Sequence, residues 1–259
     1  AAGWYNQPPF YREMRDENAV LHTGIKAQRS FHVIAGTDYD FRLWDRPFRL
    51  TGELYYKHLY NLIPYYLEDV DIQYLPGLTA KGYTCGFELR MNGEFVSDAE
   101  SWLSVSLMRS MEDRDNDGYG YYRRPSDQLL NFGLYFQDYL PNNPSWRVHM
   151  NMYYGSRLPY NPPGFSYKDG GFTLKAYKRV DLGVSKSVFR DKYGNERPGI
   201  YMLKDLSFSF EVFNLFDFRN QASYQWIRTV DNQDGLPNMF AVPDYLTGRL
   251  FNIRVSARF

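Results

Sequence analysis

Apolar and polar residues alternate with a period of two along most of the chain, which is typical of β-strands rather than helices. From Phe31 to Leu43, for example, one set of alternate positions is largely apolar and the other carries His32, Asp38 and Asp40. The pattern predicts about nine strands, at 31–43, 48–60, 83–92, 103–108, 130–137, 147–154, 179–188, 206–212 and 251–259. Most of them approach the roughly 9 to 11 residues that a tilted membrane strand needs.

The connections between these strands alternate in length. Short or moderate turns are expected near Asp45, at Asn92–Gly93 and at 141–144, and a longer one between Arg190 and Asp205. The long connections, rich in Tyr, Asp, Gly and Pro, fall at 64–81, 113–126, 158–177 and 220–247. Short turns at one end and long loops at the other indicate a transmembrane β-barrel with periplasmic turns and extracellular loops.

Four aromatic residues of the apolar phase fall at the predicted periplasmic end of their strands. They are Phe48, Phe136, Trp146 and Phe259, and they predict an aromatic girdle at the membrane interface. A soluble antiparallel sandwich also alternates and turns often, and it is the alternative fold. Long strands with charge on every polar face favour the barrel over the sandwich.

Composition agrees with a barrel. Aromatic residues make up 19% of the chain while mean hydropathy is only −0.56, as expected when apolar side chains occupy every second position. No stretch approaches the roughly 18 uninterrupted apolar residues of a spanning helix.

Charge and cysteine content exclude other classes. Lys and Arg together number 30, and so do Asp and Glu. The chain therefore has no excess of positive charge that would attract nucleic acid. Cys85 stands alone and cannot form a disulfide within the chain. The chain begins Ala1-Ala2-Gly3-Trp4 without a secretion signal, so we expect that a signal was removed or that the sequence starts partway through a longer protein.

Several motifs, in order, resemble the C-terminal barrel of TonB-dependent outer-membrane receptors, particularly those of the Bacteroidetes type. The most telling is the run Glu211-Val-Phe-Asn-Leu-Phe-Asp217. The others are Gln7-Pro-Pro-Phe-Tyr-Arg-Glu13, Glu53-Leu-Tyr-Tyr-Lys57, Lys81-Gly-Tyr83 with Gly86, Arg124-Pro-Ser-Asp127, and Tyr245-Leu-Thr-Gly-Arg249 through Phe259.

The resemblance implies an all-β fold in which residues 1–259 form the C-terminal portion of a single transmembrane barrel domain. Members of the family close about 22 strands around a plug, so about nine strands without a plug predict a fragment, a split subunit or part of a larger receptor. The expected partners are outer-membrane lipid, the remaining barrel and plug, the TonB system through the missing N-terminal part, the outer-membrane assembly machinery and a surface lipoprotein.

The implied function is transport of a scarce nutrient across the outer membrane of a Gram-negative bacterium. The substrate class stays open between siderophore, glycan, vitamin and peptide. The alternative is a self-contained small barrel that acts as an adhesin or a surface enzyme. No nucleophile elbow, zinc helix or phosphate loop occurs in the sequence, so catalysis is not expected.

Two sets of residues are predicted to face the interior or the solute. The lumen and plug-facing set is Glu53, Lys57, Glu88, Arg90, Arg147, Arg179, Asp181, Glu211 and Arg254. The loop tyrosines Tyr65, Tyr66, Tyr119, Tyr121, Tyr122 and Tyr160 are candidate substrate contacts, because aromatic faces bind sugars, peptides and flat chelates.

The last strand carries a candidate assembly signal in Phe251, Ile253, Val255 and Phe259, because barrels of this family end in an aromatic residue on an amphipathic strand. An ordinary final strand is the alternative. Asp113, Asp115 and Asp117 with Gly118 resemble the start of a calcium loop. Arg124 stands where the bidentate Glu should be, so a solvated acidic loop is favoured over structural calcium, and no other cofactor is expected.

Overall fold

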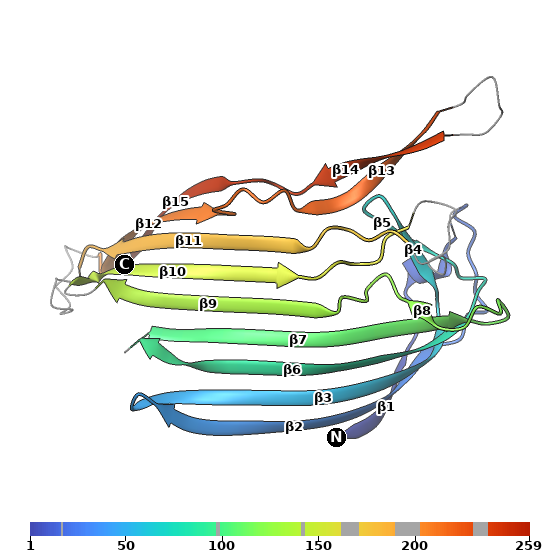
Figure 1. Cartoon of the computed structure of the whole chain (residues 1–259), viewed down its shortest axis with the longest axis horizontal. Coiled ribbons are helices and arrows are strands. Elements are labelled where there is room, and N and C mark those ends of the chain that lie inside the picture. The colour runs from blue at the N-terminus through green and yellow to red at the C-terminus, as the bar shows by residue number, and fades with distance from the viewer. Residues whose placement is uncertain (17, 97–98, 141–142, 162–170, 190–202, 230–237) are drawn as a thin grey trace.

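The computed structural model describes residues 1–16, 18–96, 99–140, 143–161, 171–189, 203–229 and 238–259. Its main sheet has eleven antiparallel strands in the order β1-β2-β3-β6-β7-β9-β10-β11-β12-β15, with β8 paired to β7 outside this path (Figure 1). The strands are β1 (Ala2–Gln7), β2 (Gln28–Leu43), β3 (Arg46–Leu62), β6 (Ala80–Val96), β7 (Ala99–Arg114), β8 (Tyr122–Arg123), β9 (Leu130–Leu140), β10 (Asn143–Gly155), β11 (Tyr177–Ser187), β12 (Asp205–Phe213) and β15 (Leu250–Arg258).

The predicted all-β antiparallel fold is confirmed, and each of the nine predicted strands is present as β2, β3, β6, β7, β9, β10, β11, β12 or β15. β1 was not predicted. It pairs along Ala2–Gln7 with Gln28–Val33 of β2, although its sequence shows no apolar alternation.

The register brings the apolar residues of neighbouring strands onto one face. Leu54 of β3 stands opposite Phe87 of β6, which in turn stands opposite Leu107 of β7. At the other side of the sheet, Val184 of β11 pairs with Phe210 of β12, and Phe210 pairs with Ile253 of β15. The apolar face is therefore continuous across the strands, as a surface in contact with lipid requires.

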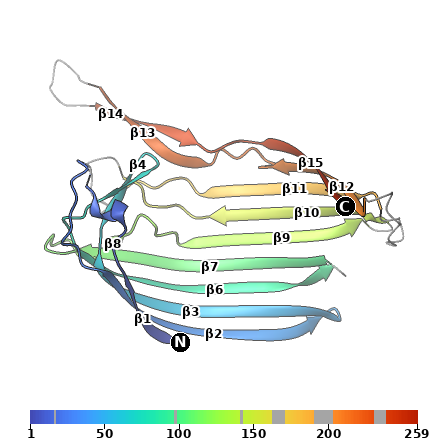
Figure 2. The same cartoon turned by 180° about the vertical axis from the view of Figure 1, so that it is seen from behind.

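The connections β2–β3, β6–β7 and β9–β10 at one end of the sheet are short, and the connections at the other end are long (Figures 1 and 2). Trp44 and Asp45 form a two-residue turn between β2 and β3 with φ of 53° and 59°, as a hairpin turn with the favoured twist requires. The predicted turn between Arg190 and Asp205, and parts of the loops at 141–144, 158–177 and 220–247, lie outside the described residues.

The long loops contain structure of their own. A short 3-10 helix, η1 (Tyr11–Met14), follows β1, and β4 (Tyr65–Glu68) pairs with β5 (Asp71–Tyr74) in a small hairpin. A second hairpin joins β13 (Gln221–Thr229) to β14 (Asn238–Tyr245). In both views this second hairpin extends from β12 and β15 toward the long-loop end (Figures 1 and 2).

The turn predicted at Asn92–Gly93 is wrong, because both residues belong to β6, which continues to Val96. Gly93 instead allows the Phe48 ring to pack closely against the backbone, since a Cβ at this position would lie 2.2 Å from Cδ1 of Phe48. Phe48 is only 3% exposed and touches Phe41, Trp44 and Phe95. It is thus covered by neighbouring rings rather than presented outward as a girdle residue.

The sheet is open. Among the described strands, β1 stands at one end of the order and β15 at the other, and each pairs with a strand on one side only. An open antiparallel sheet of this kind is consistent with a fragment of a barrel. No helix in the described part of the chain is long and apolar enough to cross a membrane.

Candidate functional site

The predicted lumen residues share the face opposite the apolar one. Glu53 stands directly opposite Glu88 in the neighbouring strand, and Arg147 stands opposite Ser185. The pairing continues from Ser185 through Ser209 to Arg254. All nine residues of the set lie in the same strand phase: Glu53, Lys57, Glu88, Arg90, Arg147, Arg179, Asp181, Glu211 and Arg254.

Glu211 connects three strands on this polar face. Its carboxylate accepts hydrogen bonds from Asn252 at 2.8 Å and from Arg254 at 3.0 and 3.1 Å. His149 of β10 lies 3.5 Å away. Because Glu211 is only 7% exposed, these partners offset the cost of burying its charge, and they fasten β15 to β12.

The rest of the Glu211–Asp217 motif shapes the turn that follows β12. Asn214 adopts a φ of 52°, and its side chain both donates to the Phe218 carbonyl and accepts from the Phe218 amide. The backbone amide of Asn214 donates to the carboxylate of Asp181 at 2.8 Å. Asp217 accepts from the amide of Arg249 at 2.8 Å. The residues that carry the family resemblance therefore hold the connection between β12 and the last strand.

A cavity of about 1030 Å³ lies between the polar face and the long loops. Its floor includes Trp102 and Ser104 from β7, Tyr153 from β10 and Arg179 from β11. Its roof comes from the loops, and includes Leu67, Asp69, Val70, Leu158, Leu174 and Gln221. The lining mixes aromatic, aliphatic, hydroxyl and amide groups, and Arg179 is paired with Asp181 at 2.7 Å.

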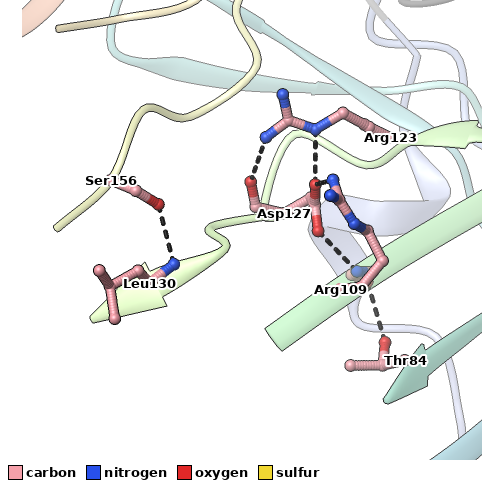
Figure 3. Close-up of polar contacts among 7 residues, drawn as sticks. Thr84, Arg109, Arg123, Asp127, Leu130 and Ser156 are labelled. Atoms are coloured by element: carbon pink, nitrogen blue, oxygen red, sulfur yellow. Dashed lines mark hydrogen bonds and ion pairs between the residues drawn. The ribbon is translucent and has the colours of Figure 1, made fainter. Parts of the chain in front are cut away.

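A charged network orders the loop between β7 and β9 (Figure 3). Asp127 is fully buried and accepts from Arg109 at 2.9 Å, from Arg123 at 2.6 Å and from the amide of Ser110 at 2.7 Å. Arg123 also donates to the Asp127 carbonyl at 3.1 Å. Asp127 lies in the Arg124–Asp127 motif, so this motif closes the loop rather than forming a chemical site.

Tyr122 belongs to a second buried group in the same loop. It is 7% exposed, and its hydroxyl donates to Glu112 at 2.9 Å, while Arg124 donates to the other oxygen of Glu112 at 3.1 Å. Burial first, and then the nearby Glu112 charge, raise the pKa of Tyr122. Tyr122 therefore packs inside the loop instead of facing a solute.

The other loop tyrosines divide by exposure. Tyr119 is 69% and Tyr121 44% exposed, so both remain available for contact with a solute. Tyr65 and Tyr66 lie in β4 and are half-buried. Tyr160 has no exposed surface, and burial raises the pKa of its hydroxyl. Sequence alone does not separate these cases, because a tyrosine suits both a core and a binding surface.

The acidic loop does not gather into a metal site. Asp113 pairs with Lys81 at 3.2 Å, and Asp117 accepts from the amide of Tyr119 at 3.0 Å. No group of three or more His, Cys, Asp or Glu residues with a metal-binding arrangement occurs among the described residues, which include Asp113, Asp115 and Asp117. The geometry does not support the calcium candidate.

The candidate assembly residues lie on the apolar face of β15. Phe251, Ile253 and Val255 are 62%, 76% and 58% exposed, and Phe259 is 72% exposed. Large apolar side chains that are this exposed are expected to be covered by lipid or by another protein surface.

No family model matches the chain, and no curated protein matches it. Several solved structures share its fold, among them the following two. The closed form of the ferric-catecholate import receptor Fiu from E. coli K12 is 17% identical, with a TM-score of 0.61 over 99% of this chain and 32% of the receptor. The copper transporter OprC is 14% identical, with a TM-score of 0.57 over 98% of this chain and 36% of the transporter.

Both structures are TonB-dependent outer-membrane receptors, and the chain spans about a third of their length. The sheet therefore has the fold of part of such a receptor barrel. Both matched proteins are transport receptors rather than enzymes.

Proposed function

We propose that the chain is the C-terminal portion of the barrel of a TonB-dependent receptor, which imports a scarce nutrient across the outer membrane of a Gram-negative bacterium. The observation that carries this proposal is the two-faced sheet, since its apolar face suits lipid and its polar face suits a lumen. The match to about a third of two receptors supports the same assignment.

In this arrangement the predicted set of charged residues, from Glu53 to Arg254, faces a plug that lies outside this sequence. The remaining strands close the barrel, and TonB acts through the missing N-terminal part. Phe259 and the apolar residues of β15 present the assembly signal. The order of the motifs supports a receptor of the Bacteroidetes type, in which a surface lipoprotein is a further partner.

The substrate is a solute such as a siderophore, glycan, vitamin or peptide. Of the six tyrosines predicted as substrate contacts, Tyr119 and Tyr121 are exposed enough to meet it first. The two matched proteins are a ferric-catecholate import receptor and a copper transporter, which makes ferric catecholate and copper the first probes to try.

An immunoblot of separated inner and outer membranes, with an antibody against β15, tests this function. We expect an outer-membrane band several times larger than the 30.6 kDa of this chain, as about 22 strands and a plug demand. We also expect deletion of the gene to reduce energy-dependent uptake of one probe solute.

A band near 30.6 kDa with no second barrel-forming chain co-purifying would instead identify a small self-contained barrel. Exclusive recovery in the inner membrane or the soluble fraction would contradict an outer-membrane location altogether.

A further inference from the structure

Three loop segments that are far apart in sequence meet above the cavity. They are the turn of the β4–β5 hairpin at Asp69, the segment 156–161 after β10, and β13 of the second hairpin. Tyr160, Asp69 and Ser223 lie at their meeting point, and both Tyr160 and Ser223 have no exposed surface. Side chains held this way at loop tips are uncommon, because loops normally lie at the surface.

The hydroxyl of Tyr160 bridges two of these segments. It lies 3.1 Å from the carbonyl oxygen of Tyr224 and 3.4 Å from that of Asp69, and it accepts from the Tyr224 amide at 3.4 Å. The Tyr160 ring also packs against the Tyr224 ring, with centroids 5.7 Å apart.

Ser223 makes the third connection. Its hydroxyl donates to the carboxylate of Asp69 at 2.5 Å and lies 3.5 Å from Asp244. Asp69 itself has a φ of 54°, a conformation that costs energy for a residue with a side chain. The contacts with Ser223 and Tyr160 are the ones that hold this turn down against β13.

The same segments form the roof of the cavity. Asp69 and Val70 line it from the hairpin, Leu158 from the segment after β10, and Gln221 with Ala222 from β13. The β4–β5 hairpin also contacts η1 in the connection between β1 and β2, because Arg12 reaches Asp71 at 3.7 Å. Movement of this hairpin would thus open the cavity toward the long-loop end.

We propose that Tyr160, Asp69 and Ser223 form a latch that keeps three loops closed over the cavity and so limits access of solutes to it. This latch rests on the proposed function, because it requires that the end of the sheet with the long loops faces the outside of the cell. The hydrogen bonds of Tyr160 and Ser223 are neutral except for those to the Asp69 and Asp244 carboxylates, so a solute that competes for them can release the roof.

The test measures access to the cavity in the full-length receptor in outer membranes. Cys85, the one cysteine of residues 1–259, and any cysteine elsewhere in the receptor are replaced by serine, and Ser104 on the cavity floor is replaced by cysteine. The rate at which a membrane-impermeant maleimide added from outside labels Cys at 104 is then compared between latch variants. Tyr160→Phe removes the hydroxyl and keeps the ring, and Ser223→Ala removes the other donor.

Each latch variant should raise the labelling rate by about fivefold, the change expected for loss of one buried hydrogen bond. Tyr11→Phe is the matched control, since it removes the hydroxyl of a loop tyrosine that is 62% exposed. Its labelling rate should not change. Unchanged rates in both latch variants, or an equal rise in the control, would overturn the latch.

Electrophoretic mobility before and after heating shows whether each variant is folded. If Tyr160→Phe does not fold, Ser223→Ala alone decides the question. The parent receptor gives an independent reading of the proposed function, because its absence from the outer membrane would contradict that function without any latch variant being made.

Discussion

Asp127 shows how a buried charge holds a loop in this protein. It has no exposed surface, yet it accepts three hydrogen bonds from Arg109, Arg123 and the Ser110 amide. A carboxylate so placed is stable only while these partners remain. Asp127 is therefore one of the side chains on which the loop between β7 and β9 depends.

Replacing Asp127 by alanine should open this loop. The change leaves the Ser110 amide and two guanidinium groups without their acceptor, at a cost of about 2 kcal/mol. Limited proteolysis of the receptor in native membranes should then cut within 115–129 much faster than in the parent. Asp115→Asn, at an exposed position of the same loop, is the control. Equal protection of Asp127→Ala and the parent would show that the network is dispensable.

At this scale the sequence predicts less than the structure shows. The alternation correctly identifies which residues share the polar face, since a strand has a fixed period of two. It does not identify burial in loops, so Tyr122 and Tyr160 were predicted as solute contacts. The partnership of Asp69 with Ser223 joins residues 154 positions apart, and no local pattern carries that information.

Among the elements, β15 combines an exposed apolar face with an unpaired edge. Its opposite edge is bound to β12 along Asp205–Phe213, and Glu211 reinforces that pairing from the polar face. The strand is thus fixed in the sheet on one side and available for pairing on the other.

Phe259→Ala should reduce the amount of receptor in the outer membrane without changing the fold of what arrives there. The reason is that the aromatic end of β15 is the proposed assembly signal, while its side chain, 72% exposed, adds little to packing. Quantitative immunoblots of outer membranes measure the level. Phe240→Ala, which truncates a 57% exposed ring on β14, is the control. Equal levels in both variants would assign Phe259 to an ordinary strand end.

The long strands could be predicted at this scale, whereas the short ones could not. Each of the nine predicted strands is present because long alternating runs leave little choice of fold. β1 has six residues and no alternation, and β2 provides its pairing. The hairpin β4–β5 lies in a segment that the sequence predicted to be a Tyr-rich loop. We predicted a turn at Gly93, but the Phe48 ring packs against this residue instead. A glycine in the sequence does not by itself distinguish a turn from such a close contact.

For the whole molecule, the two open edges set the limit on independent stability. Unpaired backbone groups in lipid cost several kcal/mol each. The edge at β15 and the part of β2 beyond its pairing with β1 would both meet lipid in this way. The sheet accordingly requires further strands to close it.

Residues 1–259 expressed alone should fail to form a stable barrel. After refolding in detergent, we expect the chain to migrate in gels without the heat-dependent shift of a closed barrel, and to associate through its edges. The full-length receptor, refolded in parallel, is the control and should show the shift. A monomeric, heat-modifiable product from residues 1–259 alone would contradict the open-sheet account.

The rings on the polar face lie across glycines instead of standing upright. A Cβ at Gly86 would come within 2.4 Å of the Tyr55 hydroxyl, and one at Gly183 within 2.3 Å of the His149 ring. Trp102 covers Gly133 in the same way, at 3.0 Å. These three rings are thereby laid flat against the sheet, and they add less height to the inner wall than their size suggests. A solute that moves along this wall meets ring faces between the charged side chains.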